Sequence, residues 1–312
     1  MFLIFINDLP NCTKLFSLLF ADDTTFQISS NDPNELFKIA NTELAKAAVW
    51  FQANKLTLNV SKTKYILFRK RNMHVNFQNL SLKIGNENVG RIGSECTTKS
   101  FKFVGLHLDE FLTWDQQINH IHGKLASSNY AINTAKNFLP LNMRITLYNS
   151  LFRSHLEYGI LAWGGVSGNK IKSIFNLQKK CLRNVANKKK SSHTDPIFSQ
   201  LKILKLSDLF KMNCLTFMHN YAFGRQPQSF NNMFTPLGAN NRTGNYQIKK
   251  YKSNLFDKFP SSFLPKIWNE NCKNIKHCVS STSLKQNLLD TFLSNYNLVE
   301  NCNYSGCPDC RN

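Results

Sequence analysis

The first thirty residues contain a long apolar run that is interrupted by two adjacent acids. Leu15 to Ala21 is largely apolar, Asp22 and Asp23 follow, and Thr24 to Ile28 resumes a strand-like pattern. An apolar run of this length between polar residues is typical of a buried strand. The pattern therefore predicts a hairpin with the acid pair at its turn, outside the sheet, where a cation can reach it.

On the residues alone, two interpretations of the pair remain open. Two neighbouring carboxylates are costly to bury unless a metal ion or a base compensates their charge, which favours a divalent-metal site. Aspartate is also common in solvated turns, and that interpretation requires no ligand.

The next segment predicts a helix that packs on a sheet. Asp32 can cap the first turn, Pro33 fits that turn, and Glu35 has capping-box spacing. Asn54-Lys55 closes the helix. Its apolar face consists of Leu36, Ala40, Leu44, Ala47 and Phe51.

Three strands are predicted after this helix. Leu56–Val60 and Thr63–Phe68 would pair around the turn at Ser61-Lys62, and Phe101–Leu108 would form one strand bent at Gly105. Together with the acidic hairpin and the helix, they predict an α+β fold in which helices cover an antiparallel sheet.

From Trp114 onward the periodicity becomes helical. Helices are expected over residues 115–138, 143–155, 169–186, 195–222 and 283–296, whereas residues 224–262 are rich in Asn, Ser, Gly and Pro and predict a loop or linker. The expected domains are 1–112 (sheet and helix), 113–223 (helical) and 224–312 (linker and tail).

The charge balance points to a polyanionic partner. Lys and Arg number 39 against 19 acids, a formal net charge of +20, which favours nucleic acid. An anionic membrane surface is the second candidate partner. The sequence has no long basic amphipathic segment and no membrane-spanning segment, so no membrane partner is predicted. The predicted phosphate contacts cluster on and after the 169–186 helix, although a solvated helix face would carry the same charges. They are Lys179, Lys180, Arg183, Lys188, Lys189 and Lys190.

The nine cysteines are odd in number and mostly isolated among apolar residues, which suits a reducing compartment such as the nucleus or cytoplasm. Cys302, Cys307 and Cys310 end the chain at close spacing, and Cys272, His277 or Cys278 could supply a fourth ligand for Zn²⁺. Reduced cysteines in a flexible tail are the alternative.

The order of motifs resembles the reverse transcriptases of non-LTR retrotransposons, in the group that includes jockey-like elements. Ile6-Asn7-Asp8-Leu9-Pro10 resembles the segment before the catalytic hairpin, and Phe20-Ala21-Asp22-Asp23 resembles the aromatic-x-Asp-Asp box. The motifs after them resemble the family's later palm, primer grip and thumb. They are Asn54–Asn59 with Lys62-Thr63, Phe103–Leu106 with Asp109 and Leu112–Trp114, Tyr158-Gly159 with Trp163-Gly164, and Leu177–Lys180.

The resemblance implies a partial polymerase palm, an α-helical thumb and a partly irregular C-terminal region. It also implies two-metal nucleotidyl transfer, with Mg²⁺ ions that activate a DNA primer end on an RNA template. Asp22 would be a metal ligand and Asp23 its partner. Lys62 would contact the triphosphate electrostatically or as a proton donor, although a solvated turn lysine is the alternative. Gly105 would let the backbone approach the primer end.

No residue here matches the family's third catalytic carboxylate or its fingers. The expectation is therefore a C-terminal fragment of the polymerase that is inactive alone and that requires an upstream half. Two alternatives stay open: a non-catalytic basic nucleic-acid-binding module, and a metal-dependent hydrolase that uses Asp22 and Asp23 with His107 or His120.

Overall fold

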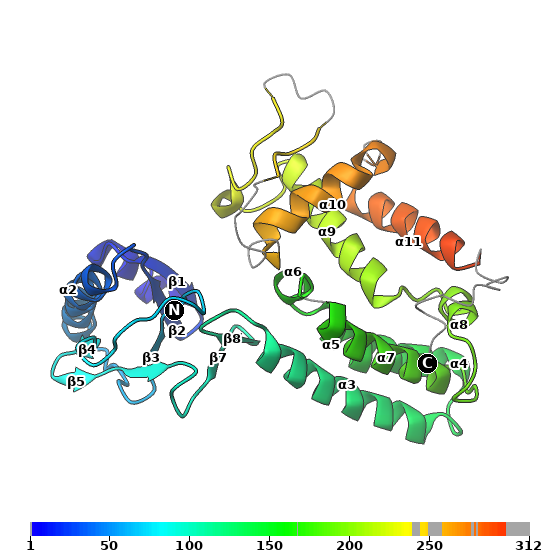
Figure 1. The fold of residues 1–312 in the computed structure, drawn as a ribbon, viewed down its shortest axis with the longest axis horizontal. Coiled ribbons are helices and arrows are strands. Elements are labelled where there is room, and N and C mark those ends of the chain that lie inside the picture. The colour runs from blue at the N-terminus through cyan, green and yellow to red at the C-terminus, as the bar shows by residue number, and fades with distance from the viewer. Residues whose placement is uncertain are drawn as a thin grey trace. The chain divides into compact units, whose positions relative to one another are not determined.

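The computed structural model describes residues 2–166, 168–238, 244–248, 258–275, 278 and 280–297. The chain divides into two compact units, Met1–Thr113 and Trp114–Asn312 (Figure 1). The division falls one residue after the boundary that the sequence predicted. Each unit is described by itself.

The first unit combines one long helix with short strands. Its helical segments are α1 (Phe2–Phe5), the 3₁₀ turn η1 (Leu9–Cys12) and α2 (Pro33–Ala53). Its strands are β1 (Phe16–Phe20), β2 (Asp23–Gln27), β3 (Lys64–Ile66), β4 (Lys83–Ile84), β5 (Glu87–Asn88), β6 (Gly90–Ile92), β7 (Ser100–Phe103) and β8 (Leu106–Asp109). They form two-stranded ladders: β1–β2, β4–β5 and β7–β8 are antiparallel and β3–β6 is parallel. Among the described residues the strands thus form small separate sheets, and a polymerase palm stays a prediction.

Both ends of α2 confirm the expectation from the sequence. The Asp32 carboxylate accepts hydrogen bonds from the backbone N–H of Asn34 at 3.0 Å and of Glu35 at 3.3 Å. At the other end Lys55 adopts a φ of 58°, and the Leu56 N–H donates to the Phe51 carbonyl at 2.8 Å. A left-handed residue that closes such a bond is a common way for a helix to stop.

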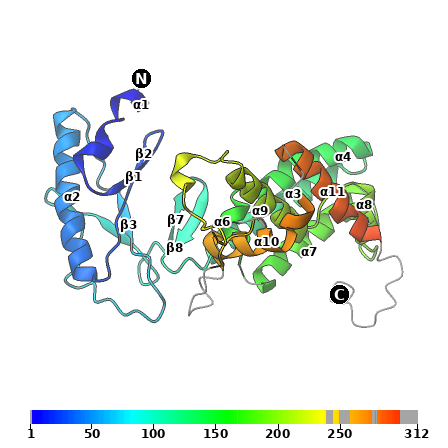
Figure 2. The same ribbon diagram turned by 90° about the horizontal axis from the view of Figure 1, so that it is seen from above.

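The packed face of α2 holds the core of this unit. Phe37 and Ala40 are buried together with Leu82 and Val89, and the ring of Tyr65 meets Phe37 edge-on at 5.6 Å. Figure 2 shows α2 running beside the strands of this unit. Phe37 replaces the predicted Leu36 as the fully buried position, so the buried stripe is rotated slightly from the expected one.

Three strand predictions were wrong. The first concerns β1, which is a strand as expected but is not buried. Phe16, Leu18 and Phe20 are 60%, 41% and 61% exposed. Successive strand side chains point to opposite faces, and a two-stranded hairpin packs on one face only, so these three lie on the open one.

The second wrong prediction is the strand Leu56–Val60, because these residues form no strand. The Asn59 side chain accepts hydrogen bonds from the Ser61 hydroxyl at 2.7 Å and the Lys62 N–H at 3.1 Å, and the Asn59 carbonyl accepts from the Thr63 hydroxyl at 2.9 Å. Such local bonds compete with strand pairing. The following strand, β3, instead pairs with β6.

The third wrong strand is Phe101–Leu108, which is a hairpin of β7 and β8 rather than one bent strand. Phe103 pairs with Leu106, and the two residues between them, Val104 and Gly105, have φ values of 42° and 83°. Positive φ at both central residues is the signature of a two-residue hairpin turn that matches strand twist.

The second unit is helical. It contains α3 (Asp115–Ala135), α4 (Leu141–Leu147), the π-helical turn η2 (Tyr148–Arg153), α5 (Ser154–Glu157), α6 (Ile160–Trp163), α7 (Gly168–Val185), α8 (Asp195–Gln200), α9 (Leu206–Ala222), the 3₁₀ turn η3 (Gln228–Phe230), α10 (Pro260–Ile275) and α11 (Ser281–Asn297). The helices expected over 115–138, 143–155, 169–186 and 283–296 are confirmed to within a few residues. The expected 195–222 segment is two helices separated by a short break.

The helix α3 packs along α7 and against η2 (Figure 1). Gln178 of α7 joins this core to α9, although its side chain is fully buried. Its amide donates to the Tyr148 hydroxyl at 2.9 Å and to the Leu204 carbonyl at 3.0 Å, and accepts from the Leu206 N–H at 3.0 Å. A buried amide that is hydrogen-bonded at both ends fixes its neighbours, and its hydrogen bonds offset the cost of removing it from water.

Of the two C-terminal helices, α11 was predicted and α10 was not. Within the described residues α10 packs on α9, and α11 packs on α8 and α9. Leu264 and Trp268 of α10 and Leu284 and Leu288 of α11 are buried. The sequence analysis missed α10, although apolar residues at helical spacing could have indicated it. Within the described residues no helix combines the length and apolarity needed to span a bilayer.

Candidate functional site

The acidic pair lies where the sequence predicted, at the turn of the β1–β2 hairpin. Phe20 pairs with Asp23, so Ala21 and Asp22 form the turn, and both carboxylates are exposed. Ala21 has a φ of 52°, a left-handed conformation that costs an L-residue roughly 1–2 kcal/mol. The hairpin therefore holds two adjacent carboxylates on a strained, solvent-facing turn.

Glu43 of α2 anchors the segment that leads into β1. Its buried carboxylate accepts hydrogen bonds from the Lys14 N–H at 2.7 Å and the Thr13 hydroxyl at 3.0 Å, and Lys46 pairs with it at 2.6 Å. The bond from the Lys14 N–H and that from Lys46 lower the pKa of Glu43 to about 2. The sequence analysis missed this residue, although an acid on the packed face of an amphipathic helix was a visible signal.

For a magnesium ion, the acidic pair would supply only part of the coordination shell. Mg²⁺ requires six oxygen ligands in octahedral geometry, and its sites retain several waters. In the described part of the chain, no three or more His, Cys, Asp and Glu side chains gather to hold a metal ion. Asp22 and Asp23 can thus contribute ligands, and the remaining ones must come from water, substrate or another segment.

Lys62 and Gly105 lie on other segments of the same unit. Lys62 is exposed in the Asn59 turn just before β3, and no ion pair joins it to the acidic pair within the described residues. Gly105 is at the tip of the β7–β8 hairpin. Each therefore lies on a tight turn, and their contacts to a ligand stay predictions.

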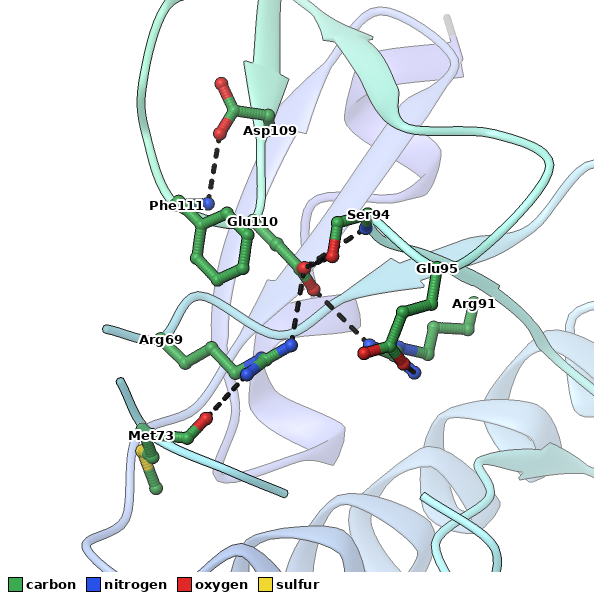
Figure 3. Close-up of polar contacts among 8 residues, drawn as sticks. All are labelled: Arg69, Met73, Arg91, Ser94, Glu95, Asp109, Glu110 and Phe111. Carbon is green, nitrogen blue, oxygen red and sulfur yellow. Dashed lines mark hydrogen bonds and ion pairs between the residues drawn. The ribbon is translucent and has the colours of Figure 1, made fainter. Parts of the chain in front are cut away.

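A buried charge cluster fixes the base of the β7–β8 hairpin (Figure 3). Glu110, 1% exposed, directly follows β8. Its carboxylate accepts hydrogen bonds from the Ser94 hydroxyl at 2.5 Å and N–H at 3.1 Å, and pairs with Arg69 at 3.4 Å and Arg91 at 3.3 Å. The Arg91 guanidinium also lies 3.1 Å from the centre of the Phe77 ring.

Burial alone raises the pKa of Glu110. The hydrogen bonds from Ser94, the charge of Arg69 and the hydrogen bond from Arg91 outweigh this effect and hold the pKa below its ordinary value. Arg69 follows β3 and Arg91 is in β6. The cluster therefore ties the hairpin that carries Gly105 to the ladder that follows Lys62. The sequence analysis did not identify Glu110, because its partners lie 16 to 41 residues away.

Asp109 forms the turn that ends the first unit. Its carboxylate accepts a hydrogen bond from the Phe111 N–H at 3.1 Å (Figure 3). It also accepts one from the Thr113 hydroxyl at 2.9 Å. Leu112 and Trp114 adopt positive φ values of 50° and 63°. The Asp109 and Leu112–Trp114 motif thus has a structural explanation as a side-chain-stabilised turn.

The motif Tyr158-Gly159 with Trp163-Gly164 also builds the fold. Gly159 has a φ of 60° just before α6, and the buried Trp163 indole donates to the Tyr158 carbonyl at 2.9 Å. A side chain at Gly164 would lie 2.5 Å from the Ile160 carbonyl oxygen and from the Phe210 ring of α9. Glycine at this position therefore permits close packing of α6 and α9.

The predicted phosphate contacts lie on α7 and in the loop after it. Lys180 is exposed and Lys179 is half-buried, its ammonium 4.8 Å from the centre of the Phe175 ring. Arg183 donates from Nε to the Ser192 carbonyl at 2.8 Å and so closes the loop. Desolvation by burial lowers the pKa of Arg183. The three lysines that this loop carries are all exposed: Lys188, Lys189 and Lys190.

The predicted zinc ligands Cys302, Cys307 and Cys310 lie outside the described residues, as do His277 and the side chain of Cys272. Cys278 is buried, and its carbonyl is 2.7 Å from Nε2 of the buried His219. The zinc site stays a prediction.

Comparison with known proteins finds similarity to the RNA-directed DNA polymerase from the mobile element jockey of Drosophila melanogaster. The two sequences are 29% identical over 114 residues, which is 35% of this chain and 12% of the polymerase. The matched part of the chain thus spans about an eighth of that relative's length. No family model and no solved structure matches the chain. Over part of its length, the chain is similar to the reverse transcriptase of a mobile element.

Proposed function

We propose that the chain is a fragment of an RNA-directed DNA polymerase of a non-LTR mobile element, with the acidic hairpin as part of its two-metal site. The observation that carries this proposal is the partial similarity to the jockey polymerase. The exposed position of both carboxylates at one tight turn supports it. The partners are an RNA template and a DNA primer.

The residues have distinct roles in this proposal. Asp22 is a ligand of Mg²⁺ and Asp23 its partner at the same turn. Lys62 contacts the triphosphate, and the Val104-Gly105 tip lies near the primer end. Glu43 and Glu110 are positioning residues, because each fixes a segment that carries one of these groups.

The pair alone does not complete the site. Two carboxylates cannot hold two Mg²⁺ ions in octahedral geometry, and the described residues place no third metal-ligating side chain beside them. Nucleotidyl transfer therefore requires another carboxylate, and this chain by itself should not extend a primer.

The test uses the full chain with a DNA primer annealed to an RNA template. We expect binding of the hybrid, broadening of amide signals at the hairpin by Mn²⁺ as a stand-in for Mg²⁺, and loss of that broadening in Asp22→Asn. Asp290→Asn, which changes an exposed acid of α11, is the matched control. No binding of the hybrid at low salt would refute the proposal. Extension that Asp22→Asn abolishes would instead refute the statement that the site is incomplete.

A non-catalytic nucleic-acid-binding module is the second candidate. The exposed lysines on α7 and in its following loop favour it, because phosphate contact needs no metal. Binding of the hybrid without any Mn²⁺ effect at Asp22 would favour this candidate over the first.

A further inference from the structure

The corner between α3 and α4, here defined as residues 130–144, presents aromatic side chains to solvent. Tyr130 is 74% exposed, and Phe138 is 84% exposed, the highest value among the large apolar residues described. Tyr130 lies in α3, and Phe138 lies in the turn that follows the end of this helix at Ala135. Leu141 and Met143, at the start of α4, are exposed as well. Rings in water lose the stabilisation that burial gives, so two largely exposed rings in one short segment can mark a binding surface.

Arg144 lies in the same corner, and no ion pair with an acid is seen for it among the described residues. Two nitrogens of the Arg144 guanidinium, Nε and Nη1, are buried without a hydrogen-bond partner among the described residues. A buried guanidinium donor without an acceptor is costly. Because Nε and Nη1 are closed to solvent, a phosphate can reach this guanidinium only through its remaining nitrogen, Nη2, and the positive charge of the group favours such a contact.

The surrounding sequence supplies no acidic partner for this guanidinium. Between Asp115 and Glu157 the chain contains no Asp or Glu, whereas it contains two lysines and two arginines. The polar residues between Tyr130 and Phe138 are amides, a hydroxyl and a lysine. A surface of separated rings within a basic, carboxylate-free segment matches proteins that stack bases along a phosphate backbone.

We propose that this corner binds a single-stranded segment of nucleic acid, with unpaired bases stacked on Tyr130 and Phe138 and a phosphate held by Arg144. Paired bases present only their edges in a duplex, so stacking on an exposed ring requires unpaired ones. The inference rests on the nucleic-acid partner of the proposed function, and it adds the kind of strand and the residues that hold it.

The test measures binding of the full chain to a fluorescent oligothymidylate and to a duplex of equal length, each across a range of salt concentrations. Tyr130→Ala and Phe138→Ala should each weaken single-strand binding by roughly five- to a hundredfold, with little change for the duplex. Tyr130→Phe and Phe138→Trp keep a stacking ring and should bind as the wild type does. Leu237→Ala, which removes an equally apolar side chain that is 53% exposed elsewhere in this unit, is the control.

The salt dependence separates stacking from charge. The alanine variants should leave the slope of log K against log salt unchanged, whereas Arg144→Gln should reduce it by about 0.7 for a single strand. Equal weakening for duplex and single strand, or alanine variants that bind as the wild type does, would overturn the inference. If the wild type binds both with a steep salt dependence in that case, the proposed function still stands. If the wild type binds neither the single strand nor the duplex, both the inference and the proposed function are wrong.

Discussion

At the scale of single residues, the structure assigns its clearest electrostatic role to Glu43. Hydrogen bonds from the Lys14 N–H and from Lys46 lower its pKa from 4.5 to about 2. A lowered pKa in the folded state means that the carboxylate stabilises the fold above its unfolded pKa and loses that contribution as the pH falls from about 4.5 towards 2. Glu43→Gln should therefore lower the urea midpoint at pH 7, and the difference from the wild type should shrink at pH 3.

The control for Glu43 is Glu35→Gln at the start of the same helix, where the acid is exposed. A Glu43→Gln midpoint that stays equally far below the wild type from pH 7 to pH 3 would contradict the role of the charged carboxylate.

Val104 shows a second residue-scale feature, a branched side chain in a left-handed conformation. Its φ is 42° and that of Gly105 is 83°, as the two-residue turn between β7 and β8 requires. Asparagine is favoured at the first of these positions. Val104→Asn should raise the free energy of unfolding by roughly 1 kcal/mol, and Gly105→Ala should lower it by roughly 1–2 kcal/mol.

Urea denaturation measures both changes at Val104 and Gly105. If Val104→Asn stabilises the fold but weakens binding of a primer–template hybrid, the valine is kept for contact rather than for stability, as strain at functional sites often indicates. If Val104→Asn and the wild type have the same free energy of unfolding, the left-handed backbone at Val104 is not strained.

At the scale of elements, two glycines in the second unit provide a matched test of packing. Gly164 lies against α9, where an added Cβ would meet the Ile160 carbonyl and the Phe210 ring at 2.5 Å, whereas Gly123 in α3 faces open space. Gly164→Ala should destabilise the unit by roughly 1–3 kcal/mol. Gly123→Ala should stabilise it by about 1 kcal/mol, since alanine favours helix. Thermal unfolding measures both, and equal effects would contradict the close packing of α6 on α9.

The sequence predicted helices better than strands, for a physical reason. Helices such as α2 and α7 are encoded locally, by the Asp32 cap and by apolar residues at helical spacing. A strand requires a partner that local patterns do not identify: β3 pairs with β6, some 26 residues away in sequence, instead of with Leu56–Val60. The acidic turn was predictable because Asp22 and Asp23 interrupt an apolar run. Glu110 was not predicted, because its partners come from distant segments. Glu43 was missed although an acid on the packed face of α2 could have indicated it.

At the scale of the whole molecule, charge is the property that both proposed functions share. The formal net charge is +20, so any polyanion is attracted, and the sequence alone cannot separate diffuse attraction from a defined interface. The exposed loop after α7 is a candidate for a defined interface. Arg183 fixes the loop by a hydrogen bond to the Ser192 carbonyl, while the lysines of the loop stay in solvent. A loop fixed in this way can place three ammonium groups against successive phosphates.

The salt dependence of duplex binding tests this arrangement. Replacing Lys188, Lys189 and Lys190 together with glutamine should weaken binding and reduce the slope of log K against log salt by about 0.9 for each phosphate that the protein no longer neutralises. Lys285→Gln, which removes an exposed charge from α11, should change the slope little, because diffuse charge releases few bound counterions. Fluorescence anisotropy with a labelled duplex measures both slopes. If the triple variant weakens binding no more per lysine than Lys285→Gln does, the loop is a solvated surface. In that case the attraction to nucleic acid resides in the total charge of the molecule.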